Sequence, residues 1–262
     1  MDYLEHLARE SGLFASAVQA APGAARVPPC PDWDADDLLW HLGEVQWFWA
    51  TIVREGVDGT GAEALKPPRP TGRAALAEFF TDASASLMVA LAAAAPETPA
   101  WTWSEDQTVG FIRRRQAHEA LIHRVDAELT AGIARSDIDP ELGSDGADEC
   151  VRIMYGGDIP AWGTLTPEPG HTVRLRTTDT GDSWFVTLGR FTGTSPSGTS
   201  YDEPACAVPG ADPGTDAAAT ISASAADLDC WLWNRPPLSE PDRSGDPEAL
   251  AGFESLRTRG ID

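Results

Sequence analysis

The sequence predicts two domains of different class: an N-terminal four-helix bundle over residues 1–157 and a smaller α+β domain over residues 158–262. Three observations predict this division. At 262 residues, the chain is long for a single domain. Apolar residues recur at helical spacing through the first part of the chain. After about residue 158, short alternating runs typical of strands replace that spacing.

Helical periodicity begins at the N-terminus. Residues 2–20 carry apolar side chains at near-helical spacing, and the pattern stops before Pro22 and Gly23. After a loop containing three prolines, Asp32 or Asp34 is positioned to cap a second helix, which ends near Gly56. Apolar residues in steps of four and three predict its core face: Leu38, Leu42, Val45, Trp49 and Ile52.

Two more long helices complete the predicted bundle. Thr71 is expected to cap the third, which runs to about Ala95, and the fourth spans about Val109 to Thr130. A shorter helical stretch around 147–155 is expected to end at the glycine pair 156–157. Four long helices with connections of this length are typical of a four-helix bundle.

The remaining residues predict a small sheet with two helices. Residues 173–176 and 184–188 alternate in the manner of half-buried strands around a Thr-Gly-Asp turn. Residues 218–224 show the same alternation in a weaker form. Helices are expected near 225–233 and 247–258, which makes this part an α+β domain of roughly a hundred residues.

Charge and cysteine content exclude several classes of partner. With 41 acidic against 19 basic residues and a net charge of −22, nothing would neutralise phosphates, so we expect no nucleic-acid partner. The acids are spread along the chain, which favours a solubilising surface over an acidic recognition face. A charged N-terminus and the lack of a long apolar run predict neither a signal peptide nor a membrane partner. Four widely spaced cysteines favour a reducing cytoplasm over a disulfide framework.

The most distinctive motif lies in the fourth predicted helix, which reads RRRQAHEALIHRVDAEL. It looks at first like a zincin motif, but His118 and His123 are five residues apart, roughly 140° around a helix, and cannot share an ion. Glu119 and His123 are four apart and point the same way. From the residues alone, this pair is either half of a transition-metal site or a solvated contact between turns. His118 is interpreted as a packed core histidine.

The rest of a metal site would have to come from another helix. His41 lies beside the apolar stripe of the second helix, where it would point into the bundle as a ligand or as a structural histidine. Asp126, three residues after His123, and Asp37, four before His41, are candidates to accept the ring N–H that selects the ligating tautomer.

Several other polar and aromatic residues receive structural interpretations. Arg115 and Arg124 are interpreted as surface ion-pair residues rather than anchors for an anionic substrate. Cys30 is interpreted as an inert buried thiol rather than a reactive one, because no base or cation lies next to it in the sequence. Three tryptophans are candidates to line a pocket, with a place in the core as the default: Trp40, Trp47 and Trp103.

Two segments, PPCPDWDADDLLWHLGEV and RRRQAHEALIHRVDAEL, together resemble the mycothiol-dependent maleylpyruvate isomerase family of actinobacteria. TISASAADLDCWLWNRPP resembles the family's C-terminal signature, so the resemblance covers nearly the whole chain. It implies a DinB-like metal-binding four-helix bundle as the N-terminal domain. It also implies that His41, Glu119 and His123 bind a divalent metal ion and that Arg235 assists activity. Asn234 stands where a glycine is commoner in the family.

The resemblance implies a metal-dependent enzyme that uses mycothiol as a thiol cosubstrate. Three protein ligands leave a position open on the ion. Zn²⁺ is the metal expected for two histidines and a glutamate, although Ni²⁺, Fe²⁺ or Mn²⁺ can fit the same ligands. A thiol at that position becomes a metal-bound thiolate. In an isomerase it adds to a small electrophile such as a cis-enedione, a bond rotates and the thiol leaves, with Arg235 binding the substrate carboxylate.

Three alternatives to this isomerase remain open. The same thiolate can be transferred to the electrophile and stay there, which would make the protein a mycothiol S-transferase in detoxification or natural-product biosynthesis. The chain can instead be a non-catalytic module that binds metal or ligand. A purely structural, four-coordinate metal site is the third alternative.

Overall fold

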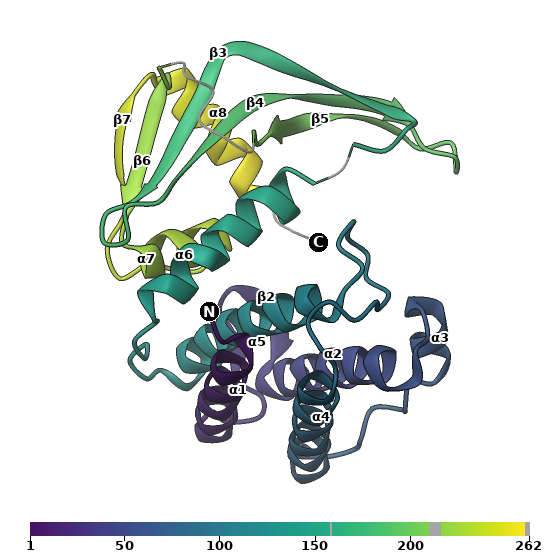
Figure 1. Ribbon diagram of the computed structural model, residues 1–262. Helices are drawn as coiled ribbons and strands as arrows, with labels where there is room; N and C mark the ends of the chain where they lie inside the picture. Colours follow the sequence, from purple (N-terminus) through teal and green to yellow (C-terminus); the bar gives the residue numbers. More distant parts are fainter. Residues whose placement is uncertain (158, 210–215, 260–262) are drawn as a thin grey trace. The chain divides into compact units, whose positions relative to one another are not determined.

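Residues 1–157, 159–209 and 216–259 are described by a computed structural model of the chain (Figure 1). The chain divides into two compact units, Met1–Asp137 and Ile138–Asp262. The division precedes helix α6 (Pro140–Glu149), whereas the sequence placed it after residue 157. Packing explains the difference, because α6 lies against α7 (Ala225–Leu232) of the second unit. A Cβ atom on Gly143 would lie 3.0 Å from the backbone of Ala225, so the two helices are in close contact.

The first unit is built on four long helices, which confirms the predicted bundle. They are α1 (Tyr3–Ala20), α2 (Ala35–Glu55), α4 (Arg73–Ala93) and α5 (Val109–Ala131). A short helix, α3 (Gly59–Ala64), and a two-stranded ribbon of β1 (Arg26–Val27) and β2 (Cys30–Asp34) lie in segments predicted to be loops. These elements are too short to produce a readable hydrophobic period.

Helix α2 starts where the sequence predicts, and its start sets the position of His41. The Asp34 carboxylate accepts hydrogen bonds from the backbone N–H groups of Asp36 (3.0 Å) and Asp37 (2.9 Å). The Asp37 carboxylate in turn accepts from the N–H of Asp34 at 3.0 Å, which completes a capping box. Gly56, with φ of +65°, ends the helix in the left-handed conformation that favours glycine.

The expectation that no segment approaches membrane-spanning length is wrong for helix α4. By length and composition alone, Arg73–Ala93 could cross a membrane. In the bundle, however, one face of the helix is buried through Leu76, Phe80, Ala83, Leu87 and Leu91, and Phe80 packs against Phe14 of α1 with ring centroids 5.0 Å apart. The helix begins after Gly72 without a side-chain cap, so the prediction that Thr71 caps it is wrong. Arg73 instead pairs with Asp36 and thereby ties α4 to the start of α2.

The described residues of the second unit form a five-stranded mixed sheet, in the order β5-β4-β3-β6-β7, with helices packed against it (Figure 1). The predicted α+β architecture is confirmed. Within the sheet β3 and β6 are parallel and the other neighbours are antiparallel. The predicted 147–155 helix is the end of α6 followed by η1, a π-helical turn. The elements are η1 (Cys150–Tyr155), β3 (Gly163–Thr177), β4 (Ser183–Thr194), β5 (Ser200–Ala207), β6 (Ala219–Ala223), β7 (Asp242–Gly245) and α8 (Pro247–Thr258).

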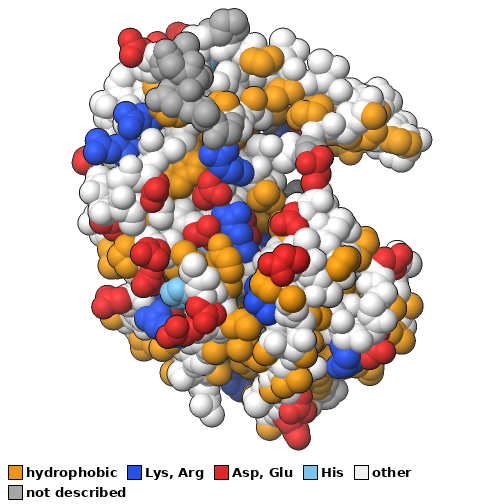
Figure 2. All heavy atoms as spheres, viewed as in Figure 1, with side chains coloured by type: hydrophobic (Ala, Val, Ile, Leu, Met, Phe, Trp, Pro, Cys, Tyr) orange, Lys and Arg blue, Asp and Glu red, His pale blue; other side chains and the backbone are white. Residues whose placement is uncertain are grey.

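Two of these strands, β5 and β7, were not predicted. All four residues of β7 are exposed, and β5 has mostly half-buried positions, so neither strand shows the clean alternation of buried and exposed residues that marks a half-buried strand. The acidic residues lie in many small groups with basic residues between them on the face seen in Figure 2. That distribution agrees with a solubilising surface rather than one acidic field.

Candidate metal centre

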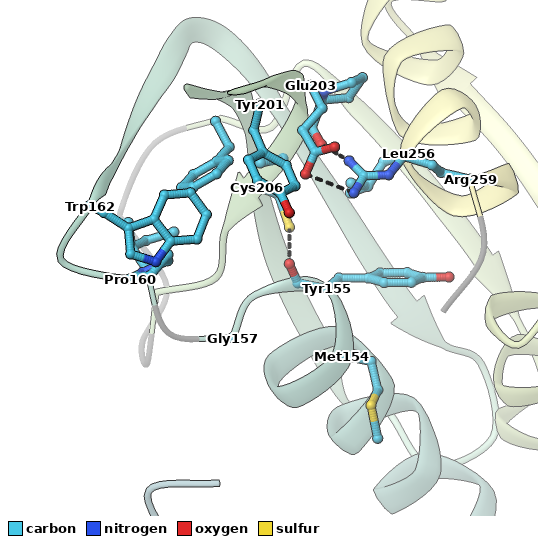
Figure 3. A pocket seen from close by; sticks show the side chains of 14 residues that line it. Met154, Tyr155, Gly157, Pro160, Trp162, Tyr201, Glu203, Cys206, Leu256 and Arg259 are labelled. Carbon is cyan, nitrogen blue, oxygen red and sulfur yellow. Dashed lines mark hydrogen bonds and ion pairs between the residues drawn. The ribbon is translucent and has the colours of Figure 1, made fainter. Parts of the chain in front are cut away.

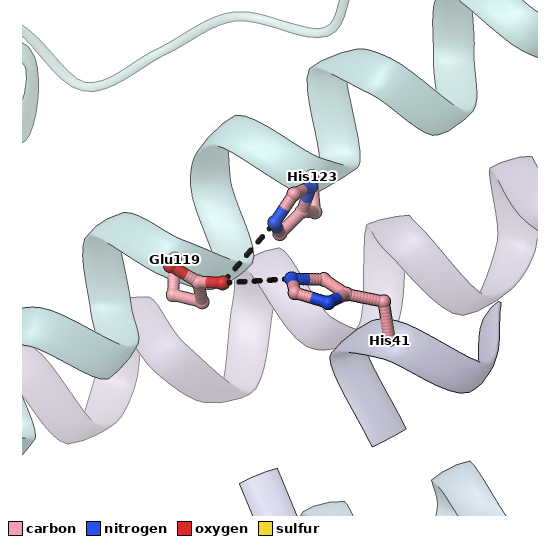
Figure 4. Close-up of side chains that lie close together, drawn as sticks. All are labelled: His41, Glu119 and His123. Carbon is pink, nitrogen blue, oxygen red and sulfur yellow. Dashed lines mark hydrogen bonds and ion pairs between the residues drawn. The ribbon is translucent and has the colours of Figure 1, made fainter. Parts of the chain in front are cut away.

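Three side chains from two helices of the first unit converge on one point. His41 lies in the second turn of α2, and Glu119 and His123 occupy successive turns of α5. One ligand atom from each of the three lies within 4.8 Å of the other two. Figure 4 shows both imidazole rings directed at a single oxygen of Glu119. The structure therefore brings together the three residues that the sequence and the family resemblance selected.

The contacts identify which atoms face the site. Oε1 of Glu119 lies 3.3 Å from Nε2 of His41 and 3.1 Å from Nε2 of His123. The His123 side chain is 9% exposed, Glu119 18% and His41 27%, so the two ligands from α5 are more shielded from solvent than the ligand from α2. Two imidazole nitrogens and a carboxylate oxygen in this arrangement are a donor set that suits Zn²⁺ and related divalent ions.

The two acids proposed to orient the histidines have different roles in the structure. Oδ2 of Asp126 lies 3.0 Å from Nδ1 of His123, so it can accept that N–H and leave Nε2 as the donor atom toward the site. The predicted contact between Asp126 and the His123 ring is confirmed. The corresponding prediction for Asp37 is wrong, because its carboxylate is used in the cap of α2 and in an ion pair with Arg69 at 2.6 Å.

The two arginines interpreted as surface residues are buried. Arg115 is 4% exposed, and its Nη2 donates to Oε2 of Glu119 at 2.7 Å. Arg124 is fully buried and donates to Glu10 of α1 and to Glu128, both at 2.8 Å. The surface interpretation is therefore wrong for both. Arg115 lies four residues before Glu119, the same spacing that identified His123, so the sequence carried a signal for its contact with Glu119.

Electrostatics at the site favour positive charge next to the Glu119 carboxylate. Burial opposes ionisation of Glu119, but His123, His41 and Arg115 outweigh it and hold the pKa of Glu119 well below its usual range. Burial also opposes a charged imidazole at His123, but Glu119 and Asp126 outweigh it and raise the pKa of His123 to about 9. A divalent ion bound to Nε2 would take the place of the proton between Nε2 and Glu119.

Trp33 is a neighbour of the site that sequence reasoning missed. Its ring centroid lies 4.6 Å from that of His41 and 6.2 Å from that of His123. It comes from strand β2, and no helical period relates a strand residue to His41, so spacing provided no signal. Of the tryptophans proposed to line a pocket, Trp40 packs against Phe79 of α4 at 5.1 Å, and Trp103 is half exposed.

His118 is separated from the site by the geometry of the helix. It is fully buried and meets the Tyr3 ring edge-on, with centroids 6.3 Å apart. It is not among the three converging ligands, although it directly precedes Glu119 in the chain. Its interpretation as a packed core histidine agrees with this environment.

Arg235, the residue predicted to assist activity, follows α7 in the second unit. Its backbone N–H donates to the carbonyl of Cys230 and its Nη1 to the carbonyl of Trp233, both at 2.7 Å. The preceding residue, Asn234, has φ of +60°. Glycine adopts this left-handed conformation most readily and asparagine tolerates it, so both residue types suit this position.

The second unit contains a cavity of about 390 Å³ of its own (Figure 3). Trp162, Phe191 and Tyr201 form an aromatic wall, and an ion pair between Arg259 and Glu203 (2.9 Å) borders it. Sγ of Cys206 approaches the carbonyl of Tyr155 at 3.5 Å. None of the predicted site residues is among the described residues that line this cavity.

Two family models match the sequence. Residues 4–128 match the model described as the mycothiol maleylpyruvate isomerase N-terminal domain, and residues 141–252 match the C-terminal domain of the same family. The two matches include the three converging residues and Arg235, and they span most of the chain. A search of curated protein sequences found no significant match.

Two crystal structures share the fold. One is a mycothiol-dependent maleylpyruvate isomerase, with a TM-score of 0.56, and the other is a variant of that isomerase in which a histidine is replaced by alanine, with a TM-score of 0.58. Each is 15% identical in sequence to this chain, and each alignment covers 93% of this chain and 92% of the solved chain. At this level of identity, the likeness establishes the architecture.

Proposed function

Because this chain belongs to the mycothiol-dependent maleylpyruvate isomerase family, we propose that it is a metal-dependent enzyme that activates mycothiol for reaction with a small electrophile. The observation that carries the proposal is the convergence of His41, Glu119 and His123 on one point of the bundle. Two neutral imidazoles and a carboxylate are a catalytic donor set, because three protein ligands leave a position for an exogenous one.

The residues around the site support this assignment. Glu119 is held ionised, and Asp126 is placed to keep the proton of His123 on Nδ1, so that Nε2 is free to bind a metal. The Trp33 ring packs beside the His41 and His123 rings and restricts their orientation. We propose Zn²⁺ as the ion, since it favours this set of nitrogen and oxygen ligands.

A divalent ion at this point supplies Lewis-acid chemistry that lowers the pKa of a thiol, so that mycothiol reacts as its anion at neutral pH. In the proposed isomerisation, the sulfur adds to one carbon of a conjugated cis double bond, and the electron pair moves onto the conjugated carbonyl. The new single bond rotates, the electron pair returns and the sulfur leaves, so the thiol is regenerated. Arg235 is proposed to bind the substrate carboxylate.

We propose that the protein acts in the cytoplasm. None of its four cysteines, all of which lie in the described residues, forms a disulfide. Burial raises the pKa of the Cys206 thiol to about 12, which keeps that thiol protonated and unreactive. Such cysteine usage is typical of proteins from a reducing compartment.

The test compares the purified full-length protein with a His41→Ala variant. We expect elemental analysis to find about one divalent ion per wild-type chain, and mycothiol to support consumption of maleylpyruvate better than glutathione or cysteine. His41→Ala should lose both the ion and the thiol-dependent activity. A matched control is His171→Ala, since His171 pairs with Glu168 in the second unit, away from the triad in the sequence and in its contacts. A metal-free His41→Ala variant that retained full activity would contradict the proposal.

The fate of the thiol separates the candidate reactions. An isomerase converts many equivalents of electrophile while the mycothiol concentration stays constant. An S-transferase consumes one mycothiol for each electrophile and forms a thioether that mass spectrometry detects. A binding module gives a calorimetric signal with mycothiol but consumes no electrophile, and a closed structural metal site gives neither.

A further inference from the structure

The contacts of Glu119 are divided between its two carboxylate oxygens. Oε1 faces Nε2 of both histidines, whereas Oε2 accepts a hydrogen bond from Nη2 of Arg115 at 2.7 Å. We infer that Arg115 is a positioning residue that restricts Glu119 to one oxygen as a metal ligand and thereby keeps a coordination position free for the thiol. This inference rests on the proposed metal-binding role of the triad.

Burial makes the contact with Arg115 persistent. The Arg115 side chain is 5% exposed and that of Glu119 18%, so little water competes for the hydrogen bond. Hydrogen bonds between a guanidinium and a carboxylate are short and strong when both groups are ionised. Both residues lie on α5 at a spacing of four, so the helix itself holds them together. Oε2 is therefore occupied before any ion arrives.

The number of carboxylate oxygens on the ion determines whether the site is open. Two imidazoles and a carboxylate that binds through both oxygens would fill four positions, which is the closed arrangement of a structural zinc site. With one oxygen the protein fills three positions, and one remains for an exogenous ligand. Because Oε2 of Glu119 is bonded to Arg115 and only Oε1 faces the histidines, the structure corresponds to the open site with one carboxylate oxygen on the ion.

The charge of Arg115 supports a geometric role rather than a contribution to affinity. A guanidinium next to a ligand carboxylate repels a divalent cation and withdraws electron density from the ligand. Removing it should therefore strengthen metal binding. The buried guanidinium therefore lowers the affinity for the metal ion, whereas its hydrogen bond fixes the orientation of Glu119.

The test uses the full-length protein loaded with Co²⁺, whose visible absorption reports coordination number, and 2-mercaptoethanol as the thiol probe. In the wild type, we expect the intense visible bands of low coordination and a sulfur-to-cobalt charge-transfer band when thiol is added. Arg115→Met should bind Co²⁺ at least as tightly as the wild type. It should also show weaker visible bands and at least a tenfold loss of apparent thiol affinity.

Two further variants isolate the role of the guanidinium. Arg115→Lys retains a cation that can reach Oε2 and should recover part of the thiol affinity. Arg113→Met is the matched control, because Nη2 of Arg113 donates to the carbonyls of Leu91 and Ala94, both at 2.7 Å, and so binds the end of α4. It should leave the cobalt spectrum unchanged.

The outcomes distinguish this inference from the proposed function. If the wild type binds neither Co²⁺ nor the thiol, the proposed function fails and the inference fails with it. If the wild type binds both and Arg115→Met has the same spectrum and thiol affinity, only the inference is overturned. Should Arg115→Met fail to fold, a crystal structure of the metal-loaded wild type decides: one Glu119 oxygen on the ion supports the inference, and two oxygens overturn it.

Discussion

The carboxylate of Asp126 lies 3.0 Å from Nδ1 of His123, while Nε2 of the same ring lies 3.1 Å from Glu119. All three residues come from α5, at spacings of three and four. One helix therefore provides two proposed metal ligands and the group that selects the tautomer of one of them. His41 from α2 is the third residue of the triad and the only one that comes from another helix.

Replacement of Asp126 by asparagine should weaken metal binding. An asparagine amide can donate toward Nδ1 and so favour the tautomer in which Nε2 carries the proton. Loss of such an outer partner typically lowers metal affinity by about 10- to 100-fold. Competition with a chromophoric chelator measures this change. Asp37→Asn is the matched control, because Asp37 caps α2 and pairs with Arg69; it should keep metal affinity within about twofold of wild type.

His118→Gln tests whether the histidine next to Glu119 takes part in metal binding. His118 is fully buried against Tyr3 and lies outside the converging group. We expect the variant to hold the same amount of metal as the wild type. Its free energy of unfolding should fall by about 1–3 kcal/mol because a buried polar environment is disturbed. Elemental analysis and urea unfolding provide the two measurements, and loss of the ion from a folded variant would contradict the assignment.

Arg124→Met tests the buried charge cluster that joins α1 to α5. Arg124 is the buried partner of both Glu10 and Glu128, each at 2.8 Å. Its removal takes the arginine away from buried Glu128 and leaves Glu10 paired with Arg9 alone, and breaking a buried pair in this way typically costs about 3–5 kcal/mol of stability. Chemical unfolding monitored by circular dichroism measures the loss. Arg190→Met, which removes an exposed pair with Asp202, should leave the unfolding midpoint almost unchanged.

Stability should decrease in alkaline solution partly because of Cys206. Burial raises the pKa of this thiol from 9.0 to about 12. Below pH 9 both folded and unfolded chains hold the proton. Between pH 9 and 12 the unfolded chain loses it first, so rising pH favours unfolding, by up to about 4 kcal/mol in total.

Urea unfolding at pH 8 and pH 10.5 measures this alkaline loss. In Cys206→Ala the difference in stability between the two pH values should be smaller than in the wild type. Because the comparison is made within each protein, the loss of packing on substitution cancels. An equal pH difference in both proteins would show that the Cys206 thiol ionises equally in the folded and unfolded states.

Local signals in the sequence account for much of the fold. The start of α2 at one of two candidate caps, its end at Gly56 and its apolar stripe depend on neighbouring residues. The structure selects Asp34 as the cap, and four of the five stripe residues are buried while Val45 is half-buried. The domain boundary was misplaced because α6 is an ordinary helix by its own sequence. Only its close approach to α7, at Gly143 and Gly146, assigns it to the second unit.

For the candidate site, spacing within one helix places Glu119, His123 and Asp126 on one face, because residues three or four apart share a face. The preference for a metal site over a solvated contact came from the family resemblance. The spacing rule also separates His118 from the pair without any knowledge of the packing. The same rule applied to Arg115, but buried arginines are uncommon, and the surface interpretation was preferred. Contacts between elements could be found only from the three-dimensional packing. His41 from α2 and Trp33 from β2 come close to α5 in the folded bundle, and no periodicity relates either residue to α5 because they lie far from it in the chain.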